Sequence, residues 1–118
     1  MNVSINIIGD AFADIYCYLE NDMPRHGGDA RLVQPMHTVA GGSALNTATH
    51  LSSLLRYFYL VDDSSHSANV TLQTVINEND AYGRVISTHC KEHELALVNR
   101  RVYPIIPVAS LVQTRQLP

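Results

Sequence analysis

Apolar and polar residues alternate near the start of the chain before an apolar pair closes the run. Residues 3–8 read Val-Ser-Ile-Asn-Ile-Ile, and Gly9 and Asp10 follow them. A run of this kind predicts a strand that is buried on one or both faces and that ends before the glycine. We expect it to be the first strand of the main sheet.

A hairpin is predicted after this strand. β-Branched and aromatic residues at 15–20 favour a second strand, and a loop that contains Pro24 and two glycines occupies 21–29. Residues 31–39 can return as a third strand, although Pro35 would place it at a sheet edge or a bulge. These segments therefore predict a small sheet apart from the main one.

From residue 42 the apolar period changes to that of a helix. Apolar residues recur at spacings of three and four, which places the following residues on one helical face: Ala44, Ala48, Leu51, Leu55 and Phe58. We expect a polar loop at 62–69 to follow, and then a strand with alternating β-branched residues at 70–76.

A second helix is predicted to begin after Asp80, which is a good N-cap, although Gly83 would weaken this helix slightly. Its inner stripe is predicted to comprise Tyr82, Val85, Ile86, His89 and Cys90. The tail at 95–112 is strand-like but interrupted by Pro104 and Pro107, which favours an edge hairpin. The order of elements predicts an α/β fold with a parallel sheet, helices and a small extra sheet.

Composition limits the class of protein. The 118 residues fit one domain, and 46% hydrophobic with 16% charged residues supply a core without the charge excess of a disordered chain. A net charge of −3 gives no electrostatic reason to expect nucleic acid or an anionic membrane as a partner. Two distant cysteines, no signal peptide and no long apolar run predict a cytoplasmic protein in a reducing setting.

Two segments carry candidate chemistry. Asp14 follows the end of the first predicted strand, at the carboxyl edge where open α/β sheets bind ligands. A carboxylate there can accept hydrogen bonds from two adjacent hydroxyls, as recognition of a polyol requires. Gly41, Gly42 and Ser43 precede the first predicted helix, so a ligand can approach its free N–H groups, and Asn46 adds an amide one turn later.

The joint spacing of these segments resembles the first part of the ribokinase-like (PfkB-type) carbohydrate and nucleoside kinases, from about residue 3 to about residue 95. The elements that carry the resemblance are a strand ending in Gly-Asp with Asp14 after it, Pro24 with Gly27-Gly28-Asp29, Gly41 to Asn46 opening a helix, and Asn79 to Gly83 opening another. The Gly-Gly-x-x-x-Asn element is the most diagnostic of them.

The resemblance implies the following roles. Asp14, Gly42 and Asn46 would line the site for a sugar or nucleoside, with Ser43 close by. Lid strands within about 14–39, with 98–112 as a further candidate range, would close over the ligand and could pair two subunits in a homodimer. Residues 1–118 would then be a truncated N-terminal portion of the kinase domain, with a partial ribokinase-like sheet.

The resemblance also implies what this chain lacks. In the family an aspartate deprotonates the sugar hydroxyl, a Gly-Ala-Gly-Asp helix start stabilises the transferring phosphoryl group, and ATP with Mg²⁺ lies on the later part of the sheet. Gly-Ala-Gly-Asp does not occur in the sequence. We therefore expect no complete site for ATP and Mg²⁺, no catalytic residue and negligible kinase activity of the chain alone. The alternative is a non-catalytic module that binds a sugar or pairs with another subunit.

The sequence offers two weaker alternatives, a zinc site and a nucleophilic serine. His89 and His93 lie four residues apart with Cys90 between them, which could suit zinc, but a third ligand at a fixed spacing is missing. Ordinary core and surface histidines are the better interpretation. Ser43 is not in a Gly-x-Ser-x-Gly setting, and no base is indicated for it, so a nucleophilic serine is not expected.

Overall fold

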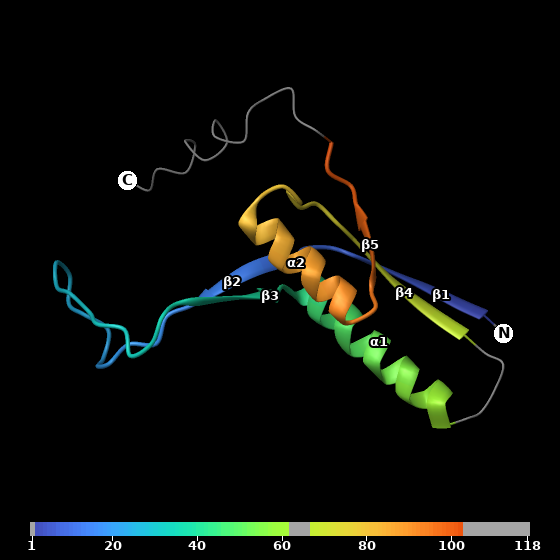
Figure 1. Cartoon of the computed structure of the whole chain (residues 1–118), viewed down its shortest axis with the longest axis horizontal. Coiled ribbons are helices and arrows are strands. Elements are labelled where there is room, and N and C mark those ends of the chain that lie inside the picture. Colours follow the sequence, from blue (N-terminus) through green and yellow to red (C-terminus); the bar gives the residue numbers. More distant parts are fainter. Residues whose placement is uncertain (1, 62–66, 103–118) are drawn as a thin grey trace.

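The computed structural model describes residues 2–61 and 67–102, in which two separate sheets and two helices are formed (Figure 1). A three-stranded parallel sheet has the order β1-β4-β5, and a two-stranded antiparallel sheet consists of β2 and β3. The fold class predicted from the sequence, α/β with a parallel sheet and a small extra sheet, is therefore confirmed. The elements are β1 (Asn2–Ile8), β2 (Phe12–Tyr16), β3 (His37–Gly41), α1 (Ser43–Val61), β4 (Ser67–Thr74), α2 (Ala81–Glu92) and β5 (Ala96–Asn99).

The hairpin strands pair closer to the body of the protein than the sequence predicted. The ladder runs from Phe12 opposite Gly41 to Tyr16 opposite His37, so most of the predicted strands at 15–20 and 31–39 lies outside it. Pro35 has no N–H to donate, and beyond the ladder the two segments meet at one isolated bridge between Leu19 and Leu32. We call residues 12–41 the arm, which extends away from the parallel sheet in Figure 1.

Two other boundaries differ from the prediction. Residues 67–69 belong to β4, because they continue its parallel pairing with β1 from Asn2 opposite Ser67. The last described strand, β5, is short, and the predicted hairpin around Pro104 and Pro107 lies outside the described residues. The same holds for most of the second candidate lid range at 98–112.

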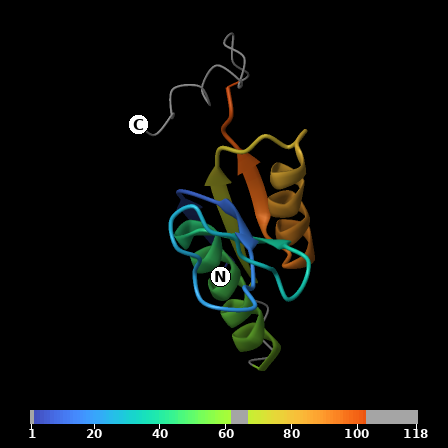
Figure 2. The ribbon, with the colours of Figure 1, turned by 90° about the vertical axis from the view of Figure 1, so that its left-hand side faces the viewer.

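The two faces of the parallel sheet differ in polarity. One face carries Val70 and Leu72 against both helices, and the buried core around Leu72 includes Leu45 of α1 and Cys90 of α2. Figure 2 shows β4 and β5 side by side, with α2 next to β5. The opposite face presents a polar row, in which the Gln73 amide donates to Oδ1 of Asn6 at 3.1 Å. Its members are Ser4, Asn6, Asn69, Thr71 and Gln73.

Two predicted inner positions are exposed in the structure. Phe58 is 57% exposed, whereas Leu55, one turn earlier in α1, packs on the core. Tyr82 is 53% exposed and lines a cleft against the arm, so its prediction as an inner residue of α2 was wrong. Gly83 is buried in its place, because this turn of α2 lies directly against the backbone of Asn77.

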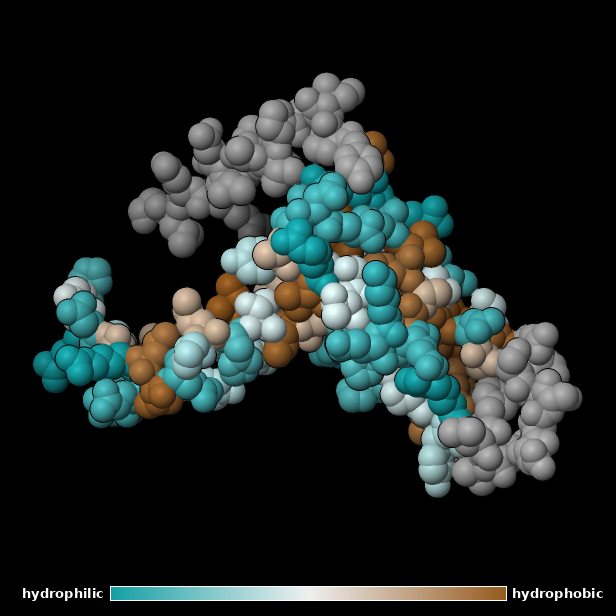
Figure 3. Space-filling view, viewed as in Figure 1, coloured by the Kyte–Doolittle hydropathy of each residue, from teal (hydrophilic) through white to brown (hydrophobic). Residues whose placement is uncertain are grey.

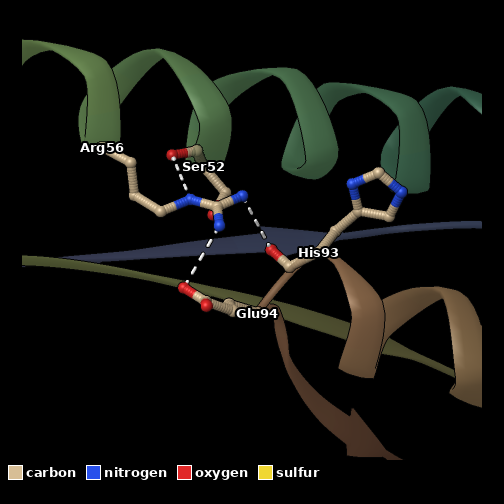
Figure 4. Close-up of polar contacts among 4 residues, drawn as sticks. All are labelled: Ser52, Arg56, His93 and Glu94. Atoms are coloured by element: carbon tan, nitrogen blue, oxygen red, sulfur yellow. Dashed lines mark hydrogen bonds and ion pairs between the residues drawn. The ribbon is translucent and has the colours of Figure 1, made fainter.

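Arg56 of α1 fastens the end of α2 to the rest of the core (Figure 4). Its guanidinium donates to the carbonyl of His93 at 3.1 Å, to Oε2 of Glu94 at 3.1 Å and to the carbonyl of Ser52 at 3.5 Å. The bond to His93 places a cation at the C-terminus of α2, where it satisfies a carbonyl and complements the helix dipole. The ion pair with Glu94 is largely exposed and adds little.

Within residues 2–61 and 67–102, neither helix combines the length and the apolarity that a membrane crossing requires.

Candidate functional site

The candidate residues lie where the arm joins α1. After β1 the chain passes through Gly9, whose N–H donates to the carbonyl of Gln73 at 3.1 Å, and then enters β2 of the arm. The other strand of the arm ends at Gly41, and α1 begins two residues later. The helix predicted after the paired glycines is thus confirmed. Asn46 closes its first turn, because the N–H of Asn46 donates to the carbonyl of Gly42 at 2.9 Å.

The carboxylate of Asp14 rests against Gly41. Asp14 pairs with Val39 in the ladder, and its side chain leans diagonally across to the neighbouring strand position at Gly41. A β-carbon at Gly41 would overlap Oδ2 of Asp14, and all three of its nearest atoms would belong to this carboxylate. Gly41 therefore leaves the space in which Asp14 reaches the start of α1.

Gly42 is held in a conformation that favours glycine. Its φ of +99° lies in the left-handed region, where a β-carbon is strained. A β-carbon would also come within 2.8 Å of the carbonyl oxygen of Asp10 and 3.1 Å of Cα of Ala11. The segment that follows β1 thus passes directly over the start of α1, and only glycine permits this approach.

Ser43 and Asn46 are exposed at the start of α1. Oγ1 of Thr47 donates a hydrogen bond to the backbone carbonyl of Ser43 at 2.8 Å, and the hydroxyl of Ser43 takes no part in this bond. Within the described part of the chain, no hydrogen bond or ion pair engages the side chains of Asp14 and Asn46. Both residues are exposed, so their polar atoms are accessible to a ligand.

Two clefts lie elsewhere, between the arm and α2. One has a volume of about 560 Å³ and is lined by Thr38, Ala40, Arg84 and His89 among others. A second, of about 420 Å³, lies between Ala13, Ile15 and Tyr82. Neither cleft is lined by the candidate residues Asp14, Gly42, Ser43 and Asn46. The side chain of Asp14 projects from the opposite face of the arm. The candidate site is an open surface at the root of the arm.

The two histidines of α2 face each other, and one of them bonds to α1. Their ring centroids are 4.2 Å apart, and Nε2 of His89 lies 2.9 Å from Oγ1 of Thr49. Because the Thr49 hydroxyl donates to the carbonyl of Leu45 at 2.8 Å, its oxygen is left to accept from His89. Within residues 2–61 and 67–102, no group of three or more His, Cys, Asp and Glu side chains is arranged to hold a metal ion.

Burial lowers the pKa of His89 below its ordinary value of 6.5, the neighbouring His93 lowers it further, and Glu92 opposes both effects. The folded state therefore binds fewer protons than the unfolded state just below pH 6.5, so stability should rise with pH in this window and fall as the pH decreases through it. Urea unfolding at several pH values gives the free energy of unfolding as a function of pH. Below pH 6.5 this free energy should depend less steeply on pH for His89→Gln than for the wild type. His50→Gln, an exposed position of α1, is the control. Equal slopes for His89→Gln and the wild type would contradict the prediction.

Two features of this region were not predicted from the sequence: the aromatic residues beside Asp14 and the contact between Asp14 and Gly41. Phe12 and Tyr16 lie two residues before and after Asp14 and share its face of β2, which the alternation of a strand could have indicated. His37 joins them from the opposite strand, because the ladder pairs it with Tyr16. The second feature is the contact between Gly41 and Asp14, which depends on register and is not visible in the sequence pattern.

Comparisons of the chain with models of protein families, with curated proteins and with solved structures find no match.

Proposed function

We propose that this chain is the sugar-recognition part of an ATP-dependent sugar kinase of the ribokinase-like type, in which phosphate passes from ATP to a sugar hydroxyl. The observation that supports the proposal best is the position of the Asp14 carboxylate. It lies against Gly41 at the start of α1, and within the described residues it has no hydrogen-bonding partner. The resemblance of the sequence to the first part of these kinases supports the same role.

Each residue of the site has a distinct part in holding a sugar. Asp14 accepts hydrogen bonds from two neighbouring hydroxyls, which a carboxylate can do with its two oxygens. Gly42 positions the site, because it lets the segment at Asp10 and Ala11 that leads into the arm pass against the start of α1. Asn46 and Ser43 offer side-chain donors and acceptors on the exposed side of this turn.

ATP and Mg²⁺ belong to the family that the sequence resembles, but the residues of this chain do not fit them. The sequence has neither Gly-Ala-Gly-Asp nor a glycine-rich phosphate loop. The described carboxylates and imidazoles form no group of three or more that could hold a metal ion. The role proposed for these residues is therefore binding and orientation of the sugar, and the phosphoryl-transfer step is not assigned to them.

A second candidate is a non-catalytic module that binds a sugar or pairs with another subunit. The polar face of the parallel sheet favours it. In a sheet covered by helices on both sides the strands are apolar on both faces, whereas here Asn6 and Gln73 bond to each other on an exposed surface. The row of Ser4, Asn6, Asn69, Thr71 and Gln73 is suited to contact with water, whereas Ile8 at the end of β1 exposes an apolar side chain on the same face.

Calorimetric titration with ribose and fructose tests the binding proposal. Asp14→Asn keeps the size of the side chain but removes its charge, so a sugar that binds the wild type should bind this variant about tenfold to a hundredfold more weakly. Asp29→Asn makes the same chemical change at an exposed position of the arm outside the ladder, and it should leave binding unchanged.

Two outcomes test the candidates. Neither candidate expects a sugar phosphate to form from ATP and Mg²⁺ with the chain alone, so its formation would contradict the assignment of binding alone to these residues. Equal affinities of Asp14→Asn and the wild type for the sugar would contradict sugar recognition in both candidates and would leave only pairing with another subunit.

A further inference from the structure

The cleft of about 560 Å³ between the arm and α2 follows the edge of β3. Three consecutive residues of the strand line it, Thr38, Val39 and Ala40. Successive side chains of a strand point to opposite faces, so three in a row share one cleft where it runs along the strand edge. No residue of β2 lines it, which places it on the side of β3 away from β2. We call this cleft the edge groove.

The strand edge in the edge groove has no partner strand within residues 2–61 and 67–102. In this part of the chain β3 pairs with β2 alone, and residues 37–41 form no other backbone hydrogen bond. Alternate residues of an edge strand direct their N–H and C=O groups away from the paired strand. The backbone of β3 can therefore accept a further strand on this side.

The opposite wall of the edge groove is one face of α2 along the whole helix (Figure 1). From its first to its last member this face is about 16 Å long, and five residues of an extended strand span about 17 Å. The two walls thus match in length, and each suits a segment of about five extended residues. The helical members of the wall are Ala81, Arg84, Val85, Thr88, His89 and Glu92.

Opposite charges stand near the two ends of the helical wall. Arg84 and Glu92 are eight residues apart, which is about 12 Å along a helix. One terminal nitrogen of Arg84 donates to the carbonyl of Asn79 at 3.0 Å, which leaves further donors of the guanidinium for a ligand. The Glu92 carboxylate forms no hydrogen bond or ion pair with the described residues. Hydrophilic residues gather over α2 in the space-filling view, and hydrophobic residues are visible along the arm to its left (Figure 3).

We propose that the edge groove binds an extended peptide segment of a partner protein, which adds to β3 as a third strand of the arm. Side chains four residues apart on one face of a strand are about 13 Å apart, which matches the separation of Arg84 and Glu92. The segment therefore carries an acidic and a basic residue four positions apart. A small apolar residue midway between them faces the half-buried Val85. This surface is separate from the proposed sugar site, whose residues do not line it.

Synthetic peptides test this inference by calorimetric titration of the whole chain. The probe is Thr-Glu-Thr-Val-Thr-Lys-Thr with blocked ends, and a second probe has its Glu and Lys exchanged, because the direction of the added strand decides which order fits. One of the two should bind, and replacement of both its charged residues by Gln should weaken it about tenfold. No binding of either probe would overturn the inference and leave the sugar site standing.

Methylation of the peptide nitrogens distinguishes strand addition from contact through charges alone. An added strand donates to β3 only from alternate residues. Of two probes that are N-methylated on the odd or on the even residues, one should lose its affinity and the other should keep it. Equal affinities of the two methylated probes would overturn strand addition.

Glu92→Lys tests the assigned charges. A lysine at the C-terminus of α2 complements the helix dipole, so the fold should be retained. The variant should bind the probe about tenfold more weakly and should prefer a peptide with Glu at both charged positions. Glu78→Lys makes the same change at an exposed position that does not line the edge groove, and it should leave the affinity unchanged.

Two results with this variant would contradict the proposed groove. Glu92→Lys that binds the probe as the wild type does would overturn the charge pattern on which the peptide was chosen. Sedimentation tests whether a second copy of the chain is the occupant instead. A dimer that dissociates in Glu92→Lys, together with no binding of either probe, would overturn the inference and make the edge groove an interface between copies.

Discussion

Gly83→Ala should destabilise the protein, although alanine is the better helix former. In a helix interior this exchange alone would add about 1 kcal/mol of stability. In α2, however, a β-carbon at residue 83 would overlap both the carbonyl oxygen and the carbonyl carbon of Asn77. Both atoms are backbone, so the helix or the 77–80 turn must shift, and we expect a net loss of about 1–3 kcal/mol.

Urea unfolding measures this loss as a lower midpoint with an unchanged slope. Thr88→Ala, at an exposed position of the same helix, is the matched control and should be neutral or slightly stabilising, because only helix propensity changes there. A Gly83→Ala protein as stable as the wild type would contradict the packing of α2 on the turn, and with it the N-cap bond of 2.6 Å from the Gly83 N–H to Asp80.

The start of α2 was predicted only in part from the sequence: the N-cap was predicted, but the buried glycine was not. Asp80 was predicted as an N-cap from residue type alone, and the structure confirms it because the cap depends only on local geometry. The role of Gly83 depends on a turn that packs against α2, so the sequence indicated only a weakened helix. The sequence assigned Tyr82 to the inner face of α2, because the helical periodicity allows either Tyr82 or Gly83 to face the core.

The candidate site divides in the same way. The Gly41-Gly42 pair before a helix is a local pattern, and it predicted the start of α1. Asp14 was expected in the segment before a strand, whereas it lies within β2, and its contact with Gly41 was not predicted. The register of the arm is a non-local property, because a shift of one residue would turn Asp14 to the face that packs on α2. The stacking of His37 on Tyr16 depends on that same register and could not be predicted from the sequence pattern alone.

Gly41→Ala should abolish most sugar binding at the proposed site while the fold remains. Its φ is not in the left-handed region, so alanine is allowed by the backbone, and the nearest atoms to the new methyl group all belong to the Asp14 carboxylate. The carboxylate must therefore turn away from the start of α1. We expect a loss of sugar affinity of about tenfold to a hundredfold, as for Asp14→Asn, measured by the same titrations.

The double variant Gly41→Ala/Asp14→Ala separates displacement of the carboxylate from damage to the arm. Because the three atoms nearest to the methyl group all belong to Asp14, the stability that Gly41→Ala loses should be recovered when Asp14 is shortened, and the two changes should couple by about 0.5–3 kcal/mol in urea unfolding. Sugar binding should not recover, since the carboxylate that accepts the hydroxyls is gone. Additive losses of stability would show that Gly41 does not contact Asp14, and retained binding in Gly41→Ala would show that the sugar does not need the carboxylate at this position.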